Sequence, residues 1–169
     1  MVRNTLKATL TVLALLATLV FAMNAPAVEY NDAAALKGVK TGKGIFLVNL
    51  DNPQKAALYL SIIKSTHESM EKQKTKPDFV VVFVGQTVRF LTTEPEAELA
   101  SKYKESLESI ALSVKALNGK GVRQEVCVIA TDFFKVSNDK LLPGLKPVGN
   151  GFTSLIGYQG KGYGLVPVM

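Results

Sequence analysis

The sequence predicts an α/β fold: a three-layer α/β/α sandwich with a mainly parallel sheet of about five strands, flavodoxin-like in the broad sense. Short β-branched apolar runs alternate along the chain with segments whose apolar residues recur every three or four positions. This alternation is typical of strands separated by helices, and it favours a parallel sheet with right-handed crossovers. Within the strands, apolar residues occupy adjacent positions, which indicates a sheet covered on both faces.

The N-terminal residues 1–27 have the pattern of a secretory signal peptide. Arg3 and Lys7 give a positively charged start, residues 8–22 form an almost unbroken apolar run, and residues 25–27 offer a small-residue cleavage site. The apolar run is short for a membrane span, which needs about 20 residues. We therefore expect an exported protein, periplasmic or secreted. An N-terminal segment that is not cleaved and holds the chain to the membrane is the alternative.

Residues 28–42 are predicted to be an irregular lead-in, and residues 43–169 a single α/β domain. Without residues 1–27 the formal net charge falls from +6 to +4, and the remaining lysines are scattered. No nucleic-acid partner is therefore expected, and no membrane span after signal cleavage. One cysteine excludes an intramolecular disulfide, and one histidine with one cysteine cannot form the usual zinc site. We expect no metal and no cofactor.

The first half of the domain is predicted to be strand, helix and strand. Residues 44–50 form the first strand, and Asn52 and Pro53 suit the N-cap and first turn of a helix. Residues 78–85 form the second strand, and residues 86–91 continue it as an extended arm or a short extra strand. The predicted buried stripe of the helix consists of Ala56, Leu60, Ile63, His67 and Met70.

The second half begins with residues 93–96, which resemble a capping box, followed by one long amphipathic helix over residues 99–117. Residues 121–130 form the third strand. Thr131 and Asp132 then suit the start of a short helix that extends to residue 136. The remaining predicted elements are a strand over 145–148, a helix opened by 149–151 and continuing through 159, and a strand over 163–167.

Cys127 lies in the third strand and is the candidate catalytic residue, because a thiolate is a strong nucleophile. If the strand ends at Cys127 or Val128, the sulfur lies at the carboxyl rim of the sheet, where open α/β sheets bind ligands. If the strand continues to Ala130, the sulfur lies about 10 Å below that rim. The apolar neighbours favour the deeper position, in which Cys127 is an inert packing residue.

Polar residues follow the first three strands and are the candidate substrate-binding residues. They are Asp51, Asn52, Gln86 and Asp132. Because the carboxyl ends of parallel strands meet at one edge of the sheet, we expect these side chains to share a pocket with Cys127.

His67, the only histidine, is predicted to be a buried or subunit-contact residue because it lies within the apolar stripe of its helix. At 1.5 Å per residue it lies about 20 Å along that helix from Asn52. A dyad of Cys127 and His67 is therefore not expected.

Several short segments follow one another in a definite order: residues 48–50, 83–85, 121–122, 126–127, 141–144, 148–151 and 159–167. This ordered set resembles the DsrE/DsrF-like family, especially its exported members. The resemblance implies a five-stranded α/β/α fold and homo-oligomers, often trimers or hexamers. Some cytoplasmic relatives oxidise or relay sulfur with a persulfide on a cysteine, and Cys127 matches that position. A sulfur-donor or sulfur-acceptor protein is then an expected partner.

Two functional hypotheses follow, and they leave open whether the chain is an enzyme. The first is an exported DsrE-like protein that handles sulfur by carrying a persulfide or exchanging thiols at Cys127. The alternative is a non-catalytic homo-oligomeric module that binds a ligand or a protein and contains an inert buried cysteine. A flavin or nucleotide binder is a third interpretation, which rests on fold analogy alone.

Overall fold

Five parallel strands form one sheet in the computed structural model, which describes residues 30–169. The strand order is β4-β3-β2-β1-β5, and each neighbouring pair is parallel. The predicted parallel sheet is confirmed, while the predicted signal peptide lies outside the described residues. The strands are β1 (Thr41–Val48), β2 (Lys76–Phe83), β3 (Arg123–Cys127), β4 (Lys146–Val148) and β5 (Gly164–Val168).

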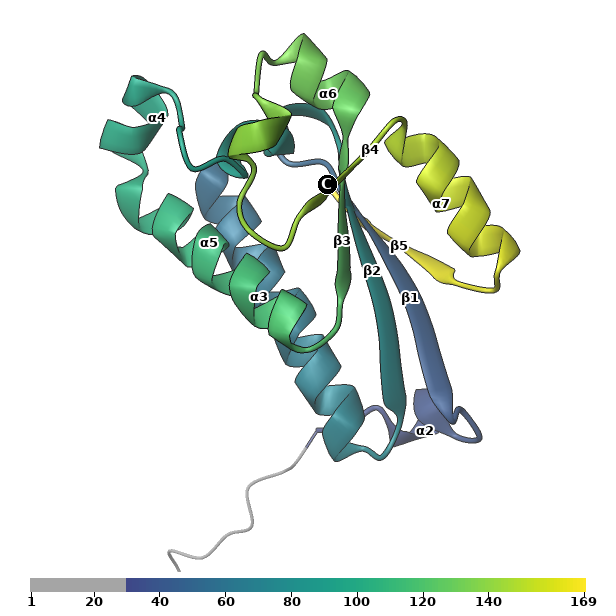
Figure 1. Ribbon diagram of the computed structural model, residues 1–169. Coiled ribbons are helices and arrows are strands. Elements are labelled where there is room, and N and C mark those ends of the chain that lie inside the picture. The colour runs from purple at the N-terminus through teal and green to yellow at the C-terminus, as the bar shows by residue number, and fades with distance from the viewer. Residues whose placement is uncertain (1–29) are drawn as a thin grey trace, which may run out of the picture. The chain divides into compact units, whose positions relative to one another are not determined.

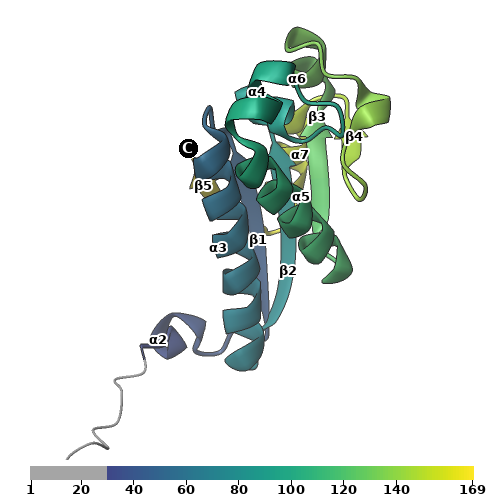
Figure 2. The same ribbon diagram turned by 90° about the vertical axis from the view of Figure 1, so that its left-hand side faces the viewer.

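Helices cover both faces of this sheet (Figure 1). The long helices α3 (Pro53–Lys72) and α5 (Lys104–Gly119) pack side by side on one face, which Figure 2 shows from the front. The helix α7 (Gly151–Gly160) covers the other face, so the predicted three-layer sandwich is confirmed. The shorter elements are α2 (Ala33–Leu36), η1 (Gly85–Phe90), α4 (Ala97–Lys102), α6 (Val128–Phe133) and η2 (Asn138–Lys140).

No helix within residues 30–169 is both long enough and apolar enough to cross a lipid bilayer.

The strand β1 begins earlier than predicted, inside the segment expected to be irregular. Its pairing with β2 already starts at Thr41, opposite Lys76. The terminal methyl group of Met70 on α3 lies where a Cβ atom of Gly42 would be. The end of α3 therefore packs directly on the backbone of β1.

The start and buried face of α3 confirm the sequence prediction. The Oδ1 atom of Asn52 accepts a hydrogen bond from the backbone N–H of Lys55 at 3.0 Å, and Pro53 occupies the first turn. The predicted stripe packs into the core, with Ala56, Leu60, Ile63 and His67 buried and Met70 half-buried against them.

The prediction of an extended arm after β2 was wrong, because the chain there forms the 3₁₀ helix η1. Gly85 turns the chain with φ of +57°, a value that side chains disfavour. The buried Thr87 hydroxyl then accepts a hydrogen bond from Leu50 N–H at 2.6 Å and donates one to Leu50 C=O at 2.9 Å. This tertiary contact ties η1 to the end of β1, which residues 86–91 alone do not indicate.

The single long helix predicted before β3 is divided into α4 and α5. Tyr103 lies between them with φ of −126°, outside the helical range. The predicted capping box is also absent: the Thr93 hydroxyl donates to the Lys140 carbonyl, and the Glu96 carboxylate accepts two hydrogen bonds from Arg89. Both groups are therefore engaged elsewhere.

The last predicted strand, helix and strand are all present, with ends displaced by no more than two residues. Asn150 caps α7, because its Oδ1 atom accepts a hydrogen bond from Phe152 N–H at 2.9 Å.

Candidate functional site

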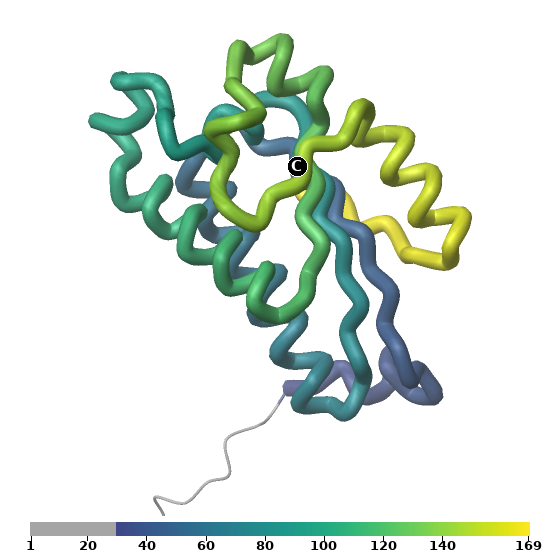
Figure 3. The backbone as a smooth tube through the Cα atoms, in the orientation of Figure 1, coloured from purple at the N-terminus to yellow at the C-terminus, as the bar shows by residue number. Residues whose placement is uncertain are grey.

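Cys127 lies at the carboxyl rim of the sheet, as the last residue of β3. The helix α6 begins directly after it at Val128, and Cys127 occupies its N-cap position with extended φ and ψ of −68° and 115°. Figure 3 shows the chain turning from β3 into α6 at this end, beside the start of α7. The prediction that the strand continues to Ala130 was wrong, and so was the prediction that the helix starts at Thr131.

The error has a local cause, since a short apolar run fits a strand or a buried helix turn equally well. In the helix, Ala130 and Thr131 face the interior while Ile129 faces solvent. The Thr131 hydroxyl also donates to the carbonyl oxygen of Val128 at 3.0 Å and lies 2.9 Å from Oδ1 of Asn138. These contacts hold the first turn of α6 against the segment that follows it.

The Cys127 side chain lines an open pocket of about 300 Å³ between α6 and the start of α7. The residue is 6% exposed, and its thiol has no hydrogen-bond partner among residues 30–169. Nearly all of the pocket wall is apolar. The lining residues are Val84, Gly85, Cys127, Ile129, Ala130, Phe133, Phe134, Asn150 and Phe152.

The close approach of α7 to β3 shapes one wall of this pocket. A Cβ atom on Gly151 would lie 3.2 Å from Cβ of Cys127 and 2.8 Å from Cγ1 of Val84. Only glycine fits here without displacing a neighbour, so the backbone at the start of α7 packs directly against the cysteine.

The four polar residues predicted to bind substrate do not line this pocket. Asp51 and Asp132 are exposed, and the Asn52 side chain caps α3. The exposed Gln86 side chain accepts a hydrogen bond from Arg89 at 3.4 Å. The expected pocket that combines these residues with Cys127 is therefore not the one that the structure forms, and their role toward a substrate stays a prediction.

Sequence reasoning missed the aromatic residues around the thiol. Phe133 is the last residue of α6, Phe134 follows it, and Phe152 follows the Asn-Gly pair that opens α7. Phe133 is 75% exposed and Phe152 is 60% exposed. The sequence did contain a signal for them: Phe133 and Phe152 each come directly after residues that were predicted to start a helix. Such positions lie at the rim of an α/β sheet, where ligands bind.

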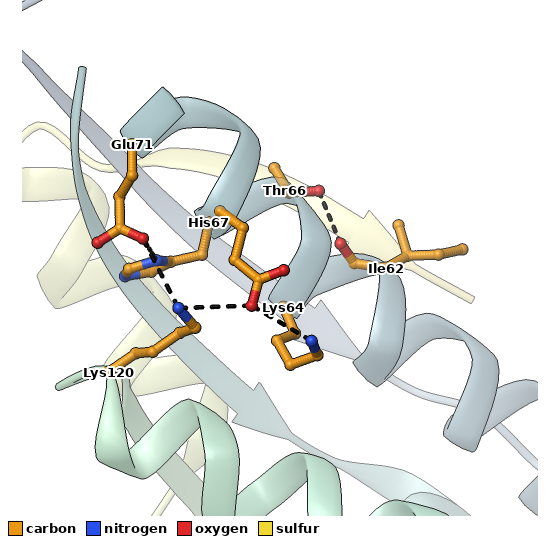
Figure 4. A network of polar contacts seen from close by, with 7 residues as sticks. Ile62, Lys64, Thr66, His67, Glu71 and Lys120 are labelled. Carbon is orange, nitrogen blue, oxygen red and sulfur yellow. Dashed lines mark hydrogen bonds and ion pairs between the residues drawn. The ribbon is translucent and has the colours of Figure 1, made fainter. Parts of the chain in front are cut away.

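His67 is a buried residue of α3, as predicted, and lies near the end of the helix that is opposite the rim. Its ring packs edge-on against Phe79 with centroids 5.6 Å apart. Its Nδ1 atom lies 3.3 Å from Oε2 of Glu71, without hydrogen-bond geometry. The same carboxylate oxygen lies 3.6 Å from Nζ of Lys120, the residue that follows α5, and Figure 4 shows this contact. This histidine therefore packs α3 against β2, while Glu71 connects α3 with the end of α5.

A larger pocket of about 400 Å³ lies between α3, β1 and β5. Its wall is also mostly apolar and includes Tyr59, Ile62 and Val166. It contains no nucleophilic thiol or imidazole, so the smaller pocket at Cys127 is the better candidate for chemistry. Among residues 30–169, no three His, Cys, Asp or Glu side chains are placed to hold a metal ion.

Solved structures share this architecture. MTH1491 from Methanobacterium thermoautotrophicum, described as a protein of unknown function, has a TM-score of 0.59 at 20% sequence identity, over 75% of this chain and 98% of its own. The YchN protein from E. coli has a TM-score of 0.55 at 18% identity, over 76% of this chain and 99% of its own. At such identities the likeness shows the fold alone.

No curated protein is similar enough in sequence to count as a match. The sequence model of the DsrE/DsrF-like family, in contrast, matches residues 42–168, which include every strand except the first residue of β1. The chain therefore belongs to the DsrE/DsrF-like family.

Proposed function

We propose that this protein handles sulfur at Cys127, by carrying a persulfide or by exchanging thiols. The observation that carries the proposal is the position of the thiol, which ends β3 and lines an open pocket at the carboxyl rim. Ligands of open α/β sheets bind at this rim. Membership of the DsrE/DsrF-like family adds support, because the resemblance implies relatives that carry a persulfide on a cysteine at the position that Cys127 matches.

The proposed transfer needs only the thiol and a persulfide donor of the form R–S–SH. The Cys127 thiolate attacks the outer sulfur of the donor, a new S–S bond forms, and the S–S bond of the donor breaks. The electron pair leaves with R–S⁻, which takes up a proton, and Cys127 then carries –S–SH. One sulfane sulfur moves between two thiols, and no external oxidant or reductant is consumed.

Intact-mass measurement on native protein tests this proposal. After incubation with a small alkyl persulfide, we expect the chain to gain the mass of one sulfur atom and to lose it on reduction. Without the donor, iodoacetamide should label Cys127 in the absence of denaturant. The Cys127→Ser variant, which keeps the side-chain size, is the control and should show neither change. No labelling and no mass gain in the folded wild-type chain would show that the Cys127 thiol neither reacts nor accepts sulfur in the native state, and would contradict the proposal.

Export is the second part of the proposal, and it rests on the signal-peptide pattern of residues 1–27, which lie outside the described residues. We propose a periplasmic or secreted mature chain. Cell fractionation with N-terminal sequencing should find a soluble chain that begins close after residue 27. A full-length chain that stays with the membrane fraction would support the uncleaved anchor instead.

Self-association into a trimer or hexamer is the third part of the proposal, and the family resemblance motivates it. The exposed apolar side chains of Ile156 on α7 and of Leu165 and Val166 on β5 provide surface for such contacts. Light scattering coupled to size-exclusion chromatography should give a mass three or six times that of one chain. A monomer across the micromolar range would contradict this part alone. A separate sulfur-donor or sulfur-acceptor protein is the expected further partner.

The burial of the thiol favours one other candidate function, a binding module whose cysteine only packs. In that case Cys127→Ser keeps the fold, the oligomer and the biological role. Loss of that role in a variant with unchanged oligomer mass and melting temperature would exclude this candidate.

A further inference from the structure

The Cys127 pocket provides no charged group to a ligand. Among the described residues that line it, Asn150 is the one whose side chain contains nitrogen or oxygen. Its Oδ1 atom already accepts the hydrogen bond from Phe152 N–H that caps α7. A bound anion would therefore lose its hydration without gaining a cation in return, which is strongly unfavourable.

Charged side chains close to the Cys127 pocket line a different pocket. Lys135 lines a separate polar pocket of about 150 Å³, which also contains the ion pair of Arg89 with Glu96. The two pockets share the Phe134 side chain. These charged side chains therefore do not contribute to the wall of the Cys127 pocket.

The mouth of the pocket exposes large apolar side chains from two elements. Ile129 and Phe133 lie one helical turn apart on α6, and Phe152 comes from α7. All three are more than half exposed. Exposed apolar groups that converge on an apolar pocket are typical of a site whose ligand covers them.

The thiol is the reactive group that such a ligand would meet. It is more than nine-tenths buried, it lines the pocket, and it has no hydrogen-bond partner among residues 30–169. A sulfur compound that reaches it through this pocket places the group next to its reacting sulfur among the aromatic side chains.

We propose that the Cys127 pocket selects uncharged sulfur compounds with an alkyl or aryl group next to the reacting sulfur, and rejects anionic ones. This inference rests on the proposed function, because it names the substrate class of the same thiol. With a disulfide R–S–S–R, the Cys127 thiolate attacks one sulfur and forms a mixed disulfide. The old S–S bond breaks, and R–S⁻ leaves with the electron pair and takes up a proton.

Two aromatic disulfides of similar size test the selectivity: dithiodipyridine, which is neutral, and dithiobis(nitrobenzoate), which carries two carboxylates. Each releases a coloured thiol, so its rate with Cys127 is read by absorbance. The ratio of the rate with the neutral reagent to the rate with the anionic reagent is measured in the folded chain and again in the chain unfolded by urea. Dividing the first ratio by the second cancels the intrinsic difference in reactivity between the two reagents. High salt screens the general attraction of a basic chain for anions.

We expect the folded chain to favour the neutral reagent at least about tenfold more than the unfolded chain does, because the anionic reagent must place a carboxylate against a wall without charged side chains and partly lose its hydration. In Phe152→Lys, a cation at the mouth should lower the preference severalfold. Leu112→Lys is the matched control, because it replaces an exposed apolar residue of α5 with the same charge away from the pocket. It should keep the wild-type preference.

The possible failures are distinguishable. If both reagents react with the folded chain and the rate ratio equals that in urea, the selectivity is overturned while the proposed function stands. If neither reagent reacts until the chain unfolds, the thiol is not accessible, and both the proposed function and this inference are wrong.

Discussion

Gly151 is the residue at which the fold and the candidate site depend on one another. Its backbone lies against Cys127 and Val84, and a Cβ atom would come within 2.8 Å of the valine. Real Cβ atoms do not make contacts this short, so a larger residue must push α7 away from β3. The same displacement would widen the wall of the thiol pocket.

We predict that Gly151→Ala destabilises the domain by about 1–3 kcal/mol, the usual cost of overpacking a buried contact. Urea unfolding followed by circular dichroism measures the change. Gly157→Ala in the same helix is the control, because nothing lies within 4 Å of a Cβ atom there. That substitution should raise stability by up to about 1 kcal/mol, the helix propensity of alanine over glycine. Equal effects of the two substitutions would contradict the close packing at Gly151.

At the scale of the elements, the second half of α7 is attached to the sheet by tyrosines. The Tyr158 hydroxyl donates a hydrogen bond to Oε1 of Glu125 on β3 at 2.9 Å. The Arg123 guanidinium lies over the Tyr158 and Tyr163 rings, 5.2 and 5.3 Å from their centroids, and pairs with Asp78 of β2. Polar and aromatic groups therefore hold this end of α7, whereas a glycine contact holds its start.

Burial raises the pKa of Tyr158 above its ordinary value, and the hydrogen bond and negative charge of Glu125 raise it further. A raised pKa means that the folded chain keeps this proton longer than the unfolded chain does. The attachment is thus fully present below the ordinary tyrosine pKa of about 10 and is lost as pH rises through the folded value.

We predict that the domain loses stability in this alkaline range, as seen in melting temperatures measured from neutral to strongly basic pH. In Tyr158→Phe the decline should be smaller, because the titrating hydroxyl is gone. Tyr30→Phe removes a fully exposed tyrosine and should keep the wild-type decline. An unchanged alkaline decline in Tyr158→Phe would show that another group is responsible.

At the scale of the whole sheet, both edge strands contain a proline. β4 at one edge has Pro147, and β5 at the other has Pro167. Asn49 N–H donates to the Val168 carbonyl at 2.9 Å, so the alternate residue Pro167 directs its backbone nitrogen toward the free edge. Without an N–H group there, the edge is a poor template for another strand.

We predict that Pro167→Val increases aggregation, since valine restores the outward N–H group in a β-favouring residue. Light scattering at increasing protein concentration measures it, and we expect the onset at a several-fold lower concentration than in the wild type. Leu165→Val changes the same edge and keeps the proline, so it should behave like the wild type. An identical onset in all three proteins would contradict a protective role of Pro167.

Sequence reasoning succeeded where neighbouring residues decide the outcome. Asn52 and Pro53 start α3 because capping and a fixed φ act within one helical turn. It failed where a residue from another part of the chain competes for the same group. Thr93 and Glu96 match a capping box, but Lys140 and Arg89 engage them, so the predicted cap does not form.

The sequence by itself determined the class of the fold, because apolar periodicity and helix-start residues are local properties that survive in any arrangement of the segments. Only the tertiary structure decided the strand order, the turn of the chain at Cys127 and the apolar pocket around its thiol. Val84, Phe133 and Phe152 come from three separate segments, and they line one cavity only because crossover connections bring the ends of β2 and β3 and the start of α7 together. Such contacts depend on packing between distant residues, which no local pattern records.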